Sequence, residues 1–191
     1  MTPSDGKGSL IDCFALVCYL PDPLASFLDQ IRHDFAPDSR ARAHVTILPP
    51  RPMLPSPTPQ NIAAAWQEIR RQLQEVPPFR VELGDVEVFA DTQAIYVAIH
   101  DSHDELKRLH GMLNSGGVRF QEAYPYHPHV TVAQELAPED VPAAAQFARW
   151  RWSEYAHDRH FVVDQLTFVR NTTEGFWTDL DSVSLTSPVA F

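Results

Sequence analysis

The sequence predicts an α+β protein in which helices cover the outside of β-sheets. Short apolar runs typical of strands alternate with segments whose apolar residues recur at helical spacing. The order strand–helix–strand–helix–strand occurs twice, over residues of about 10–91 and about 92–191. We therefore expect one domain, residues 1–191, built from two halves of the same organisation.

The first half contains three predicted strands and two predicted helices. The strands are expected at residues 14–20, 43–48 and 79–89, and the helices at 24–35 and 62–76. The six prolines between Pro49 and Pro59 predict a loop without regular structure. In the third strand the apolar alternation changes phase near Gly84, which predicts a bulge or a turn there.

The second half repeats this order and adds a hairpin. Strands are expected at residues 94–99, 129–133, 161–170 and 176–185, and helices at 102–113 and 138–152. Ser102 and Glu105 form a capping-box pattern at the start of the first helix, which places Leu106, Leu109 and Leu113 inward. Residues 171–175 are expected to join the last two strands.

Composition and charge restrict the class of protein. The chain is 44% hydrophobic and 21% charged, an ordinary balance for a globular domain. Its formal net charge of −10 argues against long duplex DNA as a partner, because acidic surfaces repel polyphosphate. No apolar run has the length of a membrane span, and Met1–Ser9 is polar. Cys13 and Cys18 show no disulfide pattern, so we expect core thiols in the reducing cytoplasm.

A short motif recurs at the same place in each half. Residues 44–47 read His-Val-Thr-Ile and residues 129–132 read His-Val-Thr-Val, and the two histidines are 85 positions apart. Side chains alternate along a strand, so each histidine shares a face with the threonine two residues later. The valine and the next β-branched residue point the other way and can pack under helices. We expect the His/Thr face to point away from the helices, toward a cleft.

These motifs resemble those of the 2H, or two-histidine, phosphoesterases. That superfamily includes the bacterial proteins called 2′-5′ RNA ligases and RNA 2′,3′-cyclic phosphodiesterases. The resemblance extends from Phe14 to about Leu185, because the order of elements matches as well as the motifs. It implies two pseudo-symmetric lobes whose antiparallel-rich sheets face a central cleft, with the helices outside.

The resemblance also implies a role for each motif residue. His44 and His129 would be the catalytic pair, and Thr46 and Thr131 would hold phosphate oxygens, without a cofactor. Some family members carry an arginine five residues after the second histidine. That position is Gln134 here, which leaves the phosphate affinity and the subgroup open.

Two imidazoles suit phosphodiester cleavage. The ordinary histidine pKa of about 6.5 lets one ring accept a proton while the other donates one. Hydroxyl groups can stabilise charge on the non-bridging oxygens, and this scheme needs no metal. The expected activity is hydrolysis of a 2′,3′-cyclic phosphate, or a related phosphodiester, of a nucleotide or RNA end by a monomer. With a 5′-hydroxyl in place of water as the attacking group, the same opening of the cyclic phosphate would be 2′-5′ ligation. Which histidine is the base stays open at this point.

Two other functions remain as alternatives. The same groove could bind a nucleotide or an RNA end without turnover. His127 and His129 could instead be two ligands of a metal site, although no acidic residue lies at a telling spacing for a third ligand. More simply, His127 and Pro128 would shape the entry to the strand. The remaining histidines are expected at the surface: His33, His100, His103, His110, His157 and His160.

Basic and aromatic residues near the motifs have two interpretations. Arg40, Arg42 and Arg51 flank the first motif and would form either a positive rim for phosphate or scattered surface charges. Arg170 is similarly ambiguous. Four aromatic residues could stack on a nucleobase or serve only in packing, and packing is the simpler reading: Tyr124, Tyr126, Phe176 and Trp177.

Overall fold

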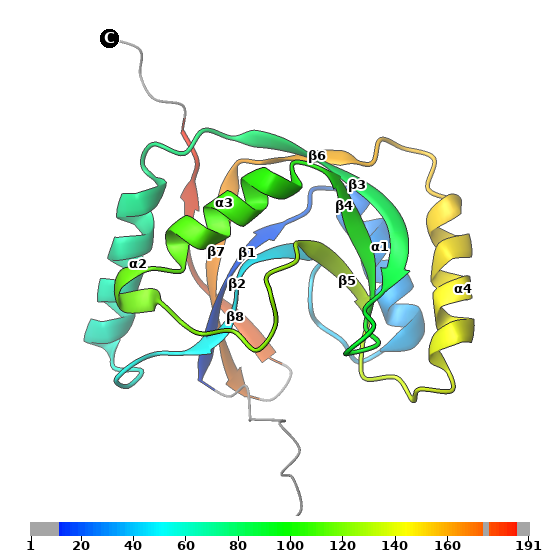
Figure 1. Ribbon diagram of the computed structural model, residues 1–191, viewed down its shortest axis with the longest axis horizontal. Helices are drawn as coiled ribbons and strands as arrows, with labels where there is room; N and C mark the ends of the chain where they lie inside the picture. The colour runs from blue at the N-terminus through cyan, green and yellow to red at the C-terminus, as the bar shows by residue number, and fades with distance from the viewer. Residues whose placement is uncertain (1–11, 174–175, 187–191) are drawn as a thin grey trace, which may run out of the picture.

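The computed structural model describes residues 12–173 and 176–186 and contains two four-stranded sheets (Figure 1). The first has the order β2-β1-β7-β8: His44–Pro52, Cys13–Tyr19, Gln165–Thr173 and Phe176–Ser184. The second has the order β5-β4-β3-β6: His129–Ala133, Ile95–Asp101, Phe79–Val88 and His160–Val163. All of these strand pairs are antiparallel. The segment Met1–Ser9 and two residues of the expected turn, 174 and 175, lie outside the described residues.

The α+β class is confirmed, and the helices lie outside the sheets. They are α1 (Leu24–Phe35), α2 (Pro59–Leu73), α3 (His103–Leu113) and α4 (Val141–Ser153), and a 3-10 turn follows α3 at Gly116–Val118. The inward residues predicted for α3, Leu106, Leu109 and Leu113, are all buried. None of the helices in the described part of the chain is both long and apolar enough to cross a membrane.

The sheets do not follow the expected division of the chain near residue 91. β3 belongs to the first half by sequence, yet it pairs with β4 and β6 of the second half. In the same way β7 pairs with β1, and β8 follows it at the edge of the first sheet. The first half therefore contributes β3 to the second sheet, the second half contributes β7 and β8 to the first sheet, and neither sheet can form from one half alone.

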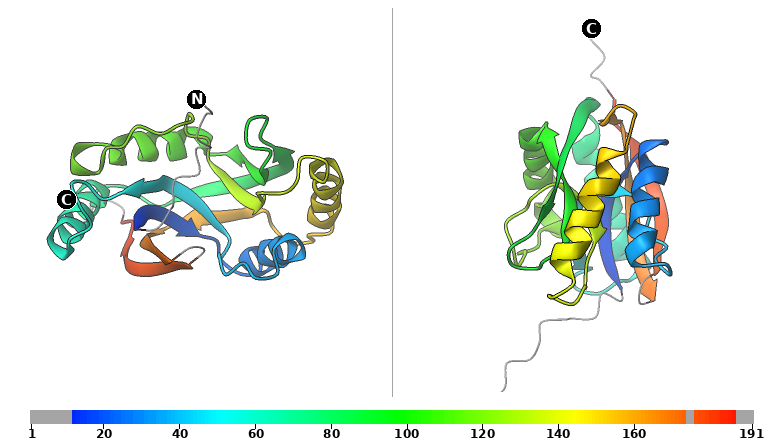
Figure 2. Two further views of the ribbon diagram at one scale, coloured as in Figure 1. Left: turned by 90° about the horizontal axis from the view of Figure 1, so that it is seen from below. Right: turned by 90° about the vertical axis from the view of Figure 1, so that its right-hand side faces the viewer.

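The helices cross over as well. α1 connects β1 to β2 in the first sheet, but it packs against β5 of the second sheet and against α4. α3 connects β4 to β5 in the second sheet, but it packs against β2 of the first sheet and against α2. These helix pairs, α1 with α4 and α2 with α3, lie at opposite ends of the molecule (Figure 1 and left view of Figure 2). The arrangement has the pseudo-symmetry that the repeated element order predicted.

Two expectations about strand boundaries are wrong. β2 continues through Pro49 and Pro50 to Pro52, where a loop was expected. Proline is tolerated because β2 is an edge strand and uses its backbone donors on one side only. The strand expected over residues 161–170 is interrupted at Asp164, because β6 joins the second sheet and β7 joins the first.

The start of α3 also differs from the expectation. Ser102 precedes the helix with a φ of 64°, and its side chain makes no capping hydrogen bond. Its hydroxyl instead donates to the backbone oxygen of Arg80 at 2.6 Å. The capping box between Ser102 and Glu105 is therefore wrong, although the helix begins where it was expected.

The phase change in β3 is confirmed as a bulge. The register between β3 and β4 shifts between Leu83 and Val86. These residues are three positions apart, a spacing that would place them on opposite faces of a regular strand, yet both side chains are buried in the core. Cys18 is buried and Cys13 half-buried, and both are free thiols. Burial, with a smaller contribution from Asp164, raises the pKa of Cys18 to about 12, so this thiol stays protonated and inert.

Candidate active site

The two motifs lie on two edge strands that contact each other. His44 and Thr46 are on β2, and His129 and Thr131 are on β5; each strand is at the end of its own sheet. β2 and β5 meet at the centre of the molecule (Figure 1). The expected alternation is observed: the histidines and threonines are half-buried, and the residues between and after them are fully buried: Val45, Ile47, Val130 and Val132.

Each imidazole is oriented by the same local hydrogen bond. Nδ1 of His44 lies 2.7 Å from the backbone oxygen of Arg42, and Nδ1 of His129 lies 2.7 Å from that of His127. A carbonyl oxygen can only accept, so Nδ1 carries the hydrogen in both rings. Nε2 of each neutral ring is then an acceptor, and neither Nε2 is hydrogen-bonded within residues 12–173 and 176–186.

The surroundings favour the neutral form of both imidazoles. Burial lowers the pKa of His44 to about 4; the bond to Arg42 opposes this, and the charges of Arg32, His129 and Arg42 add to it. Burial also lowers the pKa of His129; the hydrogen bond to the backbone of His127 opposes this, and the charge of the His127 ring adds to it. Because the charge of His129 acts on His44, the two rings belong to one electrostatic site.

The first sheet supplies one wall of the site. Tyr19 pairs with His44 across β1 and β2, and its ring meets the imidazole edge-on at 6.2 Å between centroids. The Arg42 guanidinium lies 3.5 Å from the centroid of the Tyr19 ring. Both side chains bind Asp179 on β8, the tyrosine hydroxyl at 2.7 Å. This wall is therefore an aromatic surface with a cation beside it.

The second sheet supplies a matching aromatic wall. Tyr96 pairs with Thr131 across β4 and β5, and Phe89 stacks on it at 4.0 Å between centroids. The His129 ring meets both rings edge-on, at 4.9 Å from Phe89 and 5.4 Å from Tyr96. The hydroxyl of Tyr96 donates to Glu87 at 2.8 Å. Each histidine thus lies against an aromatic ring whose hydroxyl is held by a carboxylate.

The basic residues expected near the first motif separate into two groups. Arg42 lies beside the site, and Arg40 lies over the exposed ring of Phe176. Arg51 is buried, so neither the rim nor the scattered surface position describes it. Arg170 pairs with Asp12 and lies over Phe14, on the core face of its sheet.

The aromatic candidates also separate. Tyr126 stacks on His110 and is half-buried, so packing rather than base stacking describes it. Trp177 packs against the small cluster of Ala15, Val17 and Val169. That cluster lies on the His44 face of the first sheet, because Val17 pairs with Thr46. Phe176 and Tyr124 are exposed.

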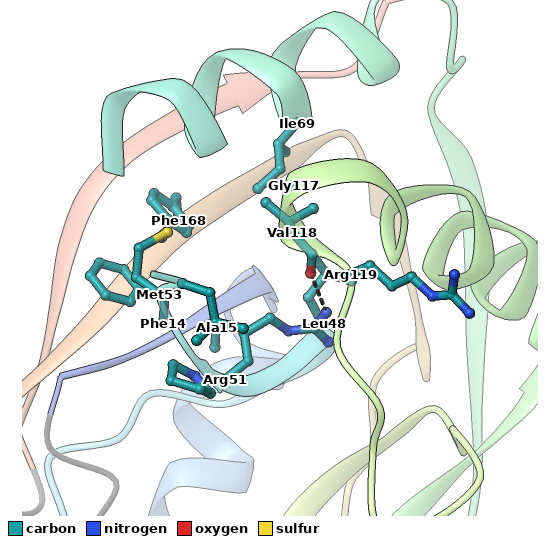
Figure 3. Close-up of a pocket in the computed structure, with 12 residues that line it drawn as sticks. Phe14, Ala15, Leu48, Arg51, Met53, Ile69, Gly117, Val118, Arg119 and Phe168 are labelled. Atoms are coloured by element: carbon teal, nitrogen blue, oxygen red, sulfur yellow. Dashed lines mark hydrogen bonds between the residues drawn. The ribbon is translucent and has the colours of Figure 1, made fainter. Parts of the chain in front are cut away.

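Two pockets lie outside the motifs. One is a mainly apolar gap between β2, β7, α2 and the 3-10 turn, with Leu48, Met53, Ile69 and Phe168 in its wall (Figure 3). The other is polar, and one of its lining residues, Ala98, pairs with His129 across β4 and β5. Its polar lining comes from Glu82, Asp85, Glu87, His100 and Arg159. Neither pocket is lined by the four motif residues.

The described residues provide no clustered metal ligands. No group of three or more His, Cys, Asp and Glu side chains in this part of the chain is placed to hold a metal ion. The His127 and His129 rings lie 6.5 Å apart between centroids, and each takes part in the aromatic wall. For the alternative in which His127 and His129 bind a metal ion, the described residues therefore provide no third ligand. Gln134 follows β5 directly and is exposed.

The fold and the placement of the motifs together define an α+β protein of two pseudo-symmetric lobes, in which a histidine–threonine motif lies on one edge strand of each sheet. Residues 20–175 match the family model of the 2′-5′ RNA ligase superfamily, and the chain belongs to that family.

Curated relatives and solved structures agree with this assignment. The chain is 24% identical to a protein of Halalkalibacterium halodurans named "Putative phosphoesterase", over 85% of this chain and 95% of the relative. A protein of the same name from Geobacillus kaustophilus is 28% identical over 76% and 84%. The crystal structure of E. coli LigT in apo form superimposes with a TM-score of 0.64 at 17% identity, covering 92% of this chain and 98% of LigT.

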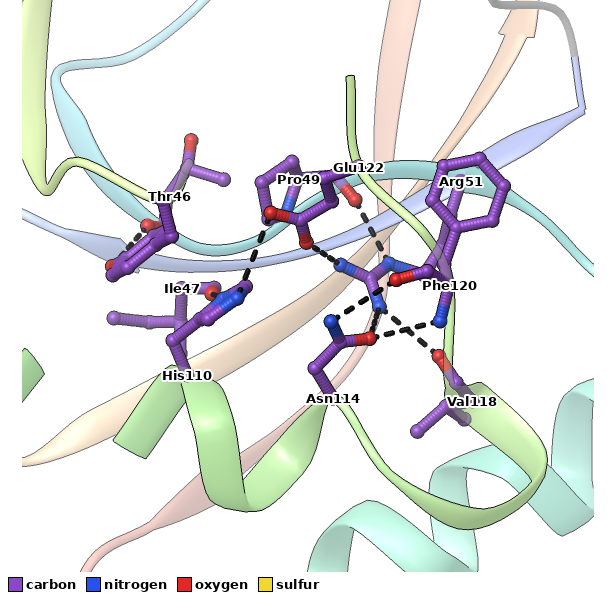
Figure 4. A network of polar contacts seen from close by, with 10 residues as sticks. Thr46, Ile47, Pro49, Arg51, His110, Asn114, Val118, Phe120 and Glu122 are labelled. Atoms are coloured by element: carbon purple, nitrogen blue, oxygen red, sulfur yellow. Dashed lines mark hydrogen bonds and ion pairs between the residues drawn. The ribbon is translucent and has the colours of Figure 1, made fainter. Parts of the chain in front are cut away.

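Sequence reasoning missed a set of residues that connect the two motifs. Arg51 on β2 forms a largely buried polar network with Asn114 and Glu122, which lie beside His110 in the segment that leads from α3 to β5 (Figure 4). His110 was expected at the surface, but its Nδ1 donates to the backbone oxygen of Ile47 at 2.8 Å. Arg32 was not singled out at all. No spacing in the sequence marks these residues, because their partners, whether side chains or backbone oxygens, lie far away in the chain.

Proposed function

We propose that this protein is a phosphodiesterase that opens a 2′,3′-cyclic phosphate, or a related phosphodiester, of a nucleotide or RNA end without a metal. The observation that carries the proposal is the matched pair of imidazoles on two contacting edge strands. In both rings Nδ1 is bound to backbone and Nε2 is free to act. Such a pair can serve one phosphorus as base and acid.

His44 is proposed as the base and His129 as the acid. A base must be neutral before reaction, and the pKa of His44, about 4, keeps it so. The buried cation of Arg32 favours this neutral state further. His44 would take a proton from the attacking water, and His129 would give one to the departing ribose oxygen. Thr46 and Thr131 lie on the same faces as the rings, where their hydroxyls would donate to the non-bridging oxygens.

Ligands of a structural neighbour support this substrate class. Crystal structures of E. coli LigT contain phosphate and 3′-AMP. Opening a 2′,3′-cyclic phosphate leaves a phosphate on one ribose oxygen, as in 3′-AMP. With an RNA 5′-hydroxyl in place of water, the same pair of histidines would form a 2′-5′ bond. We propose a single chain in the cytoplasm as the active unit.

The test is turnover of 2′,3′-cyclic nucleotides by the purified protein in the presence of EDTA. His44→Ala and His129→Ala should each lower kcat by about 10²–10⁴-fold, the usual contribution of a general acid or base. His157→Ala removes an exposed histidine and serves as the matched control. Full turnover in both motif variants, each folded by circular dichroism, would end the proposal. Binding of the nucleotide without any product would indicate a binding module instead.

A further inference from the structure

Each motif strand is held by a side chain that reaches it from across the molecule. The hydroxyl of Tyr126, in the segment before β5, donates to the backbone oxygen of Thr46 at 2.9 Å. The guanidinium of Arg32, on α1, donates to the backbone oxygen of Thr131. Thus the threonine carbonyl of each motif accepts a hydrogen bond from a residue of the other half of the chain.

The two contacts are related by the pseudo-symmetry of the fold. Tyr126 lies three residues before His129 and contacts the first motif directly. Ala41 lies three residues before His44, and its backbone oxygen accepts from Arg32 at 2.8 Å. Arg32 therefore joins the segment before His44 to Thr131, as Tyr126 joins the segment before His129 to Thr46.

Both contacts use backbone groups that an edge strand leaves without a ladder partner. β2 and β5 each end a sheet, so one side of each strand has carbonyl oxygens that no neighbouring strand satisfies. Arg32 is 7% exposed, and Tyr126 stacks on His110 with an interplanar angle of 3°, so both donors are fixed in place. Hydrogen bonds from such donors fix the separation of the two strands.

We infer that Arg32 and Tyr126 are positioning residues, which hold the two histidine–threonine strands in alignment so that both imidazoles can act on one phosphorus. The inference rests on the proposed function. Alignment matters because a displacement of about 1 Å in a reacting group can cost about a hundredfold in rate. Arg32 adds a second effect, since its charge favours the neutral form of His44.

Tyr126→Phe is the cleanest test. It keeps the ring that stacks on His110 and removes only the hydrogen bond to Thr46. With a 2′,3′-cyclic nucleotide as substrate, kcat should fall about tenfold or more while KM stays within about twofold. Tyr155→Phe is the matched control, because Tyr155 is a buried tyrosine that packs against Phe27 and Trp152, away from both motifs.

Arg32 variants separate geometry from charge. Lysine keeps the charge but lacks the planar fork that reaches two carbonyls, so Arg32→Lys should lower kcat without moving the acidic limb of the pH profile. Arg32→Met should lower kcat and also raise the pKa of His44. Arg149→Met is the control. Arg149 on α4 donates to the backbone oxygen of Val86 on β3, the strand against which α4 packs, so its contact does not join the two motif strands.

The pH readout concerns His44 and its charged neighbours. These are Arg32 on α1, Arg42 before β2, His129 on β5 and the Tyr19–Asp179 pair on β1 and β8. Only Arg32 changes in these variants, so a rise in the His44 pKa, followed by imidazole NMR, reports the loss of its charge. A His44 pKa unchanged in folded Arg32→Met would contradict the electrostatic part of the inference.

Amide hydrogen exchange tests positioning without turnover. Exchange at Val45–Leu48 and Val130–Ala133 should be faster in Tyr126→Phe and Arg32→Lys than in the wild type, and unchanged in both controls. If the wild type has no turnover, the proposed function fails. The amide exchange rates still decide whether Arg32 and Tyr126 hold the two motif strands in place. Tyr126→Phe and Arg32→Lys proteins with kcat within twofold of the wild type would overturn the inference. If Arg32→Met does not fold, the kcat values and exchange rates of Tyr126→Phe and Arg32→Lys decide whether the inference holds.

Discussion

His44 and His129 show how closely two distant residues can share one environment. Both imidazoles bind the backbone oxygen two residues earlier, and both contact an aromatic ring edge-on. Burial lowers the pKa of each ring. They differ in the charges nearby: Arg32 and Arg42 act on His44, whereas His127 acts on His129. The matching hydrogen bonds and ring contacts support a shared reaction, and the difference in nearby charge supports different roles.

A pH profile follows from these two pKa values. The base must be deprotonated, so kcat/KM should rise as pH increases through the pKa of His44, about 4. The acid must keep its proton, so kcat/KM should fall as pH increases through the pKa of His129, which burial lowers below its ordinary value of 6.5. The profile should be bell-shaped with its maximum between about pH 4 and 6.5. Rates with a cyclic nucleotide from pH 3.5 to 9 would check this, and a maximum above pH 8 would contradict the assignment.

At the scale of elements, the segment between α3 and β5 depends on one buried arginine. Arg51 donates to the side chains of Asn114 and Glu122, both at 2.7 Å, and to the backbone oxygen of Val118 at 3.0 Å. Asn114 in turn binds the backbone of Phe120. The segment that carries Tyr126 toward the second motif is therefore attached to β2 of the first motif.

Removing this arginine should destabilise the protein strongly. Arg51→Met would leave the nearly buried carboxylate of Glu122 without its main partner, and the free energy of unfolding should fall by about 3–5 kcal/mol. Urea denaturation followed by circular dichroism measures this. The double variant Arg51→Met/Glu122→Gln should lose less than the single one.

An exposed ion pair provides the comparison for Arg51. Arg71 pairs with Glu68 on the surface of α2, and Arg71→Met should lower the free energy of unfolding far less than Arg51→Met, because exposed ion pairs contribute little. Equal losses in Arg51→Met and Arg71→Met would show that the buried network does not hold this segment.

At the scale of the whole molecule, the two halves are interleaved. β3 and β7 each pair with strands of the other half, and α1 and α3 each pack on the other sheet. Most buried apolar residues consequently form one continuous core. The motifs therefore come from separate halves of the sequence but from one cooperative structure.

Separate expression of the halves tests this interleaving. Fragments 1–91 and 92–191 should each be unfolded alone, because each lacks strands of both sheets. Circular dichroism and amide proton dispersion would show it, and mixing the fragments should restore native spectra. A cooperative unfolding transition in either isolated fragment would contradict the expectation.

By itself the sequence determined the element types, the repeated order and the two motifs. These features are local: apolar periodicity sets strands and helices, and alternation places each histidine beside its threonine. Periodicity also indicated the bulge near Gly84 and the inward leucines of α3.

Only the tertiary structure decided which sheet each strand joins, and hence which side chains meet the motifs. Pairing between distant strands leaves no local periodic signal, so the exchange of β3 and β7, the break at Asp164 and the crossing of α1 and α3 were not predictable. Arg32 and Tyr126 bind carbonyl oxygens, which every residue has, and so their partners have no sequence signature. The backbone of the two edge strands, rather than any motif, determines where these side chains act.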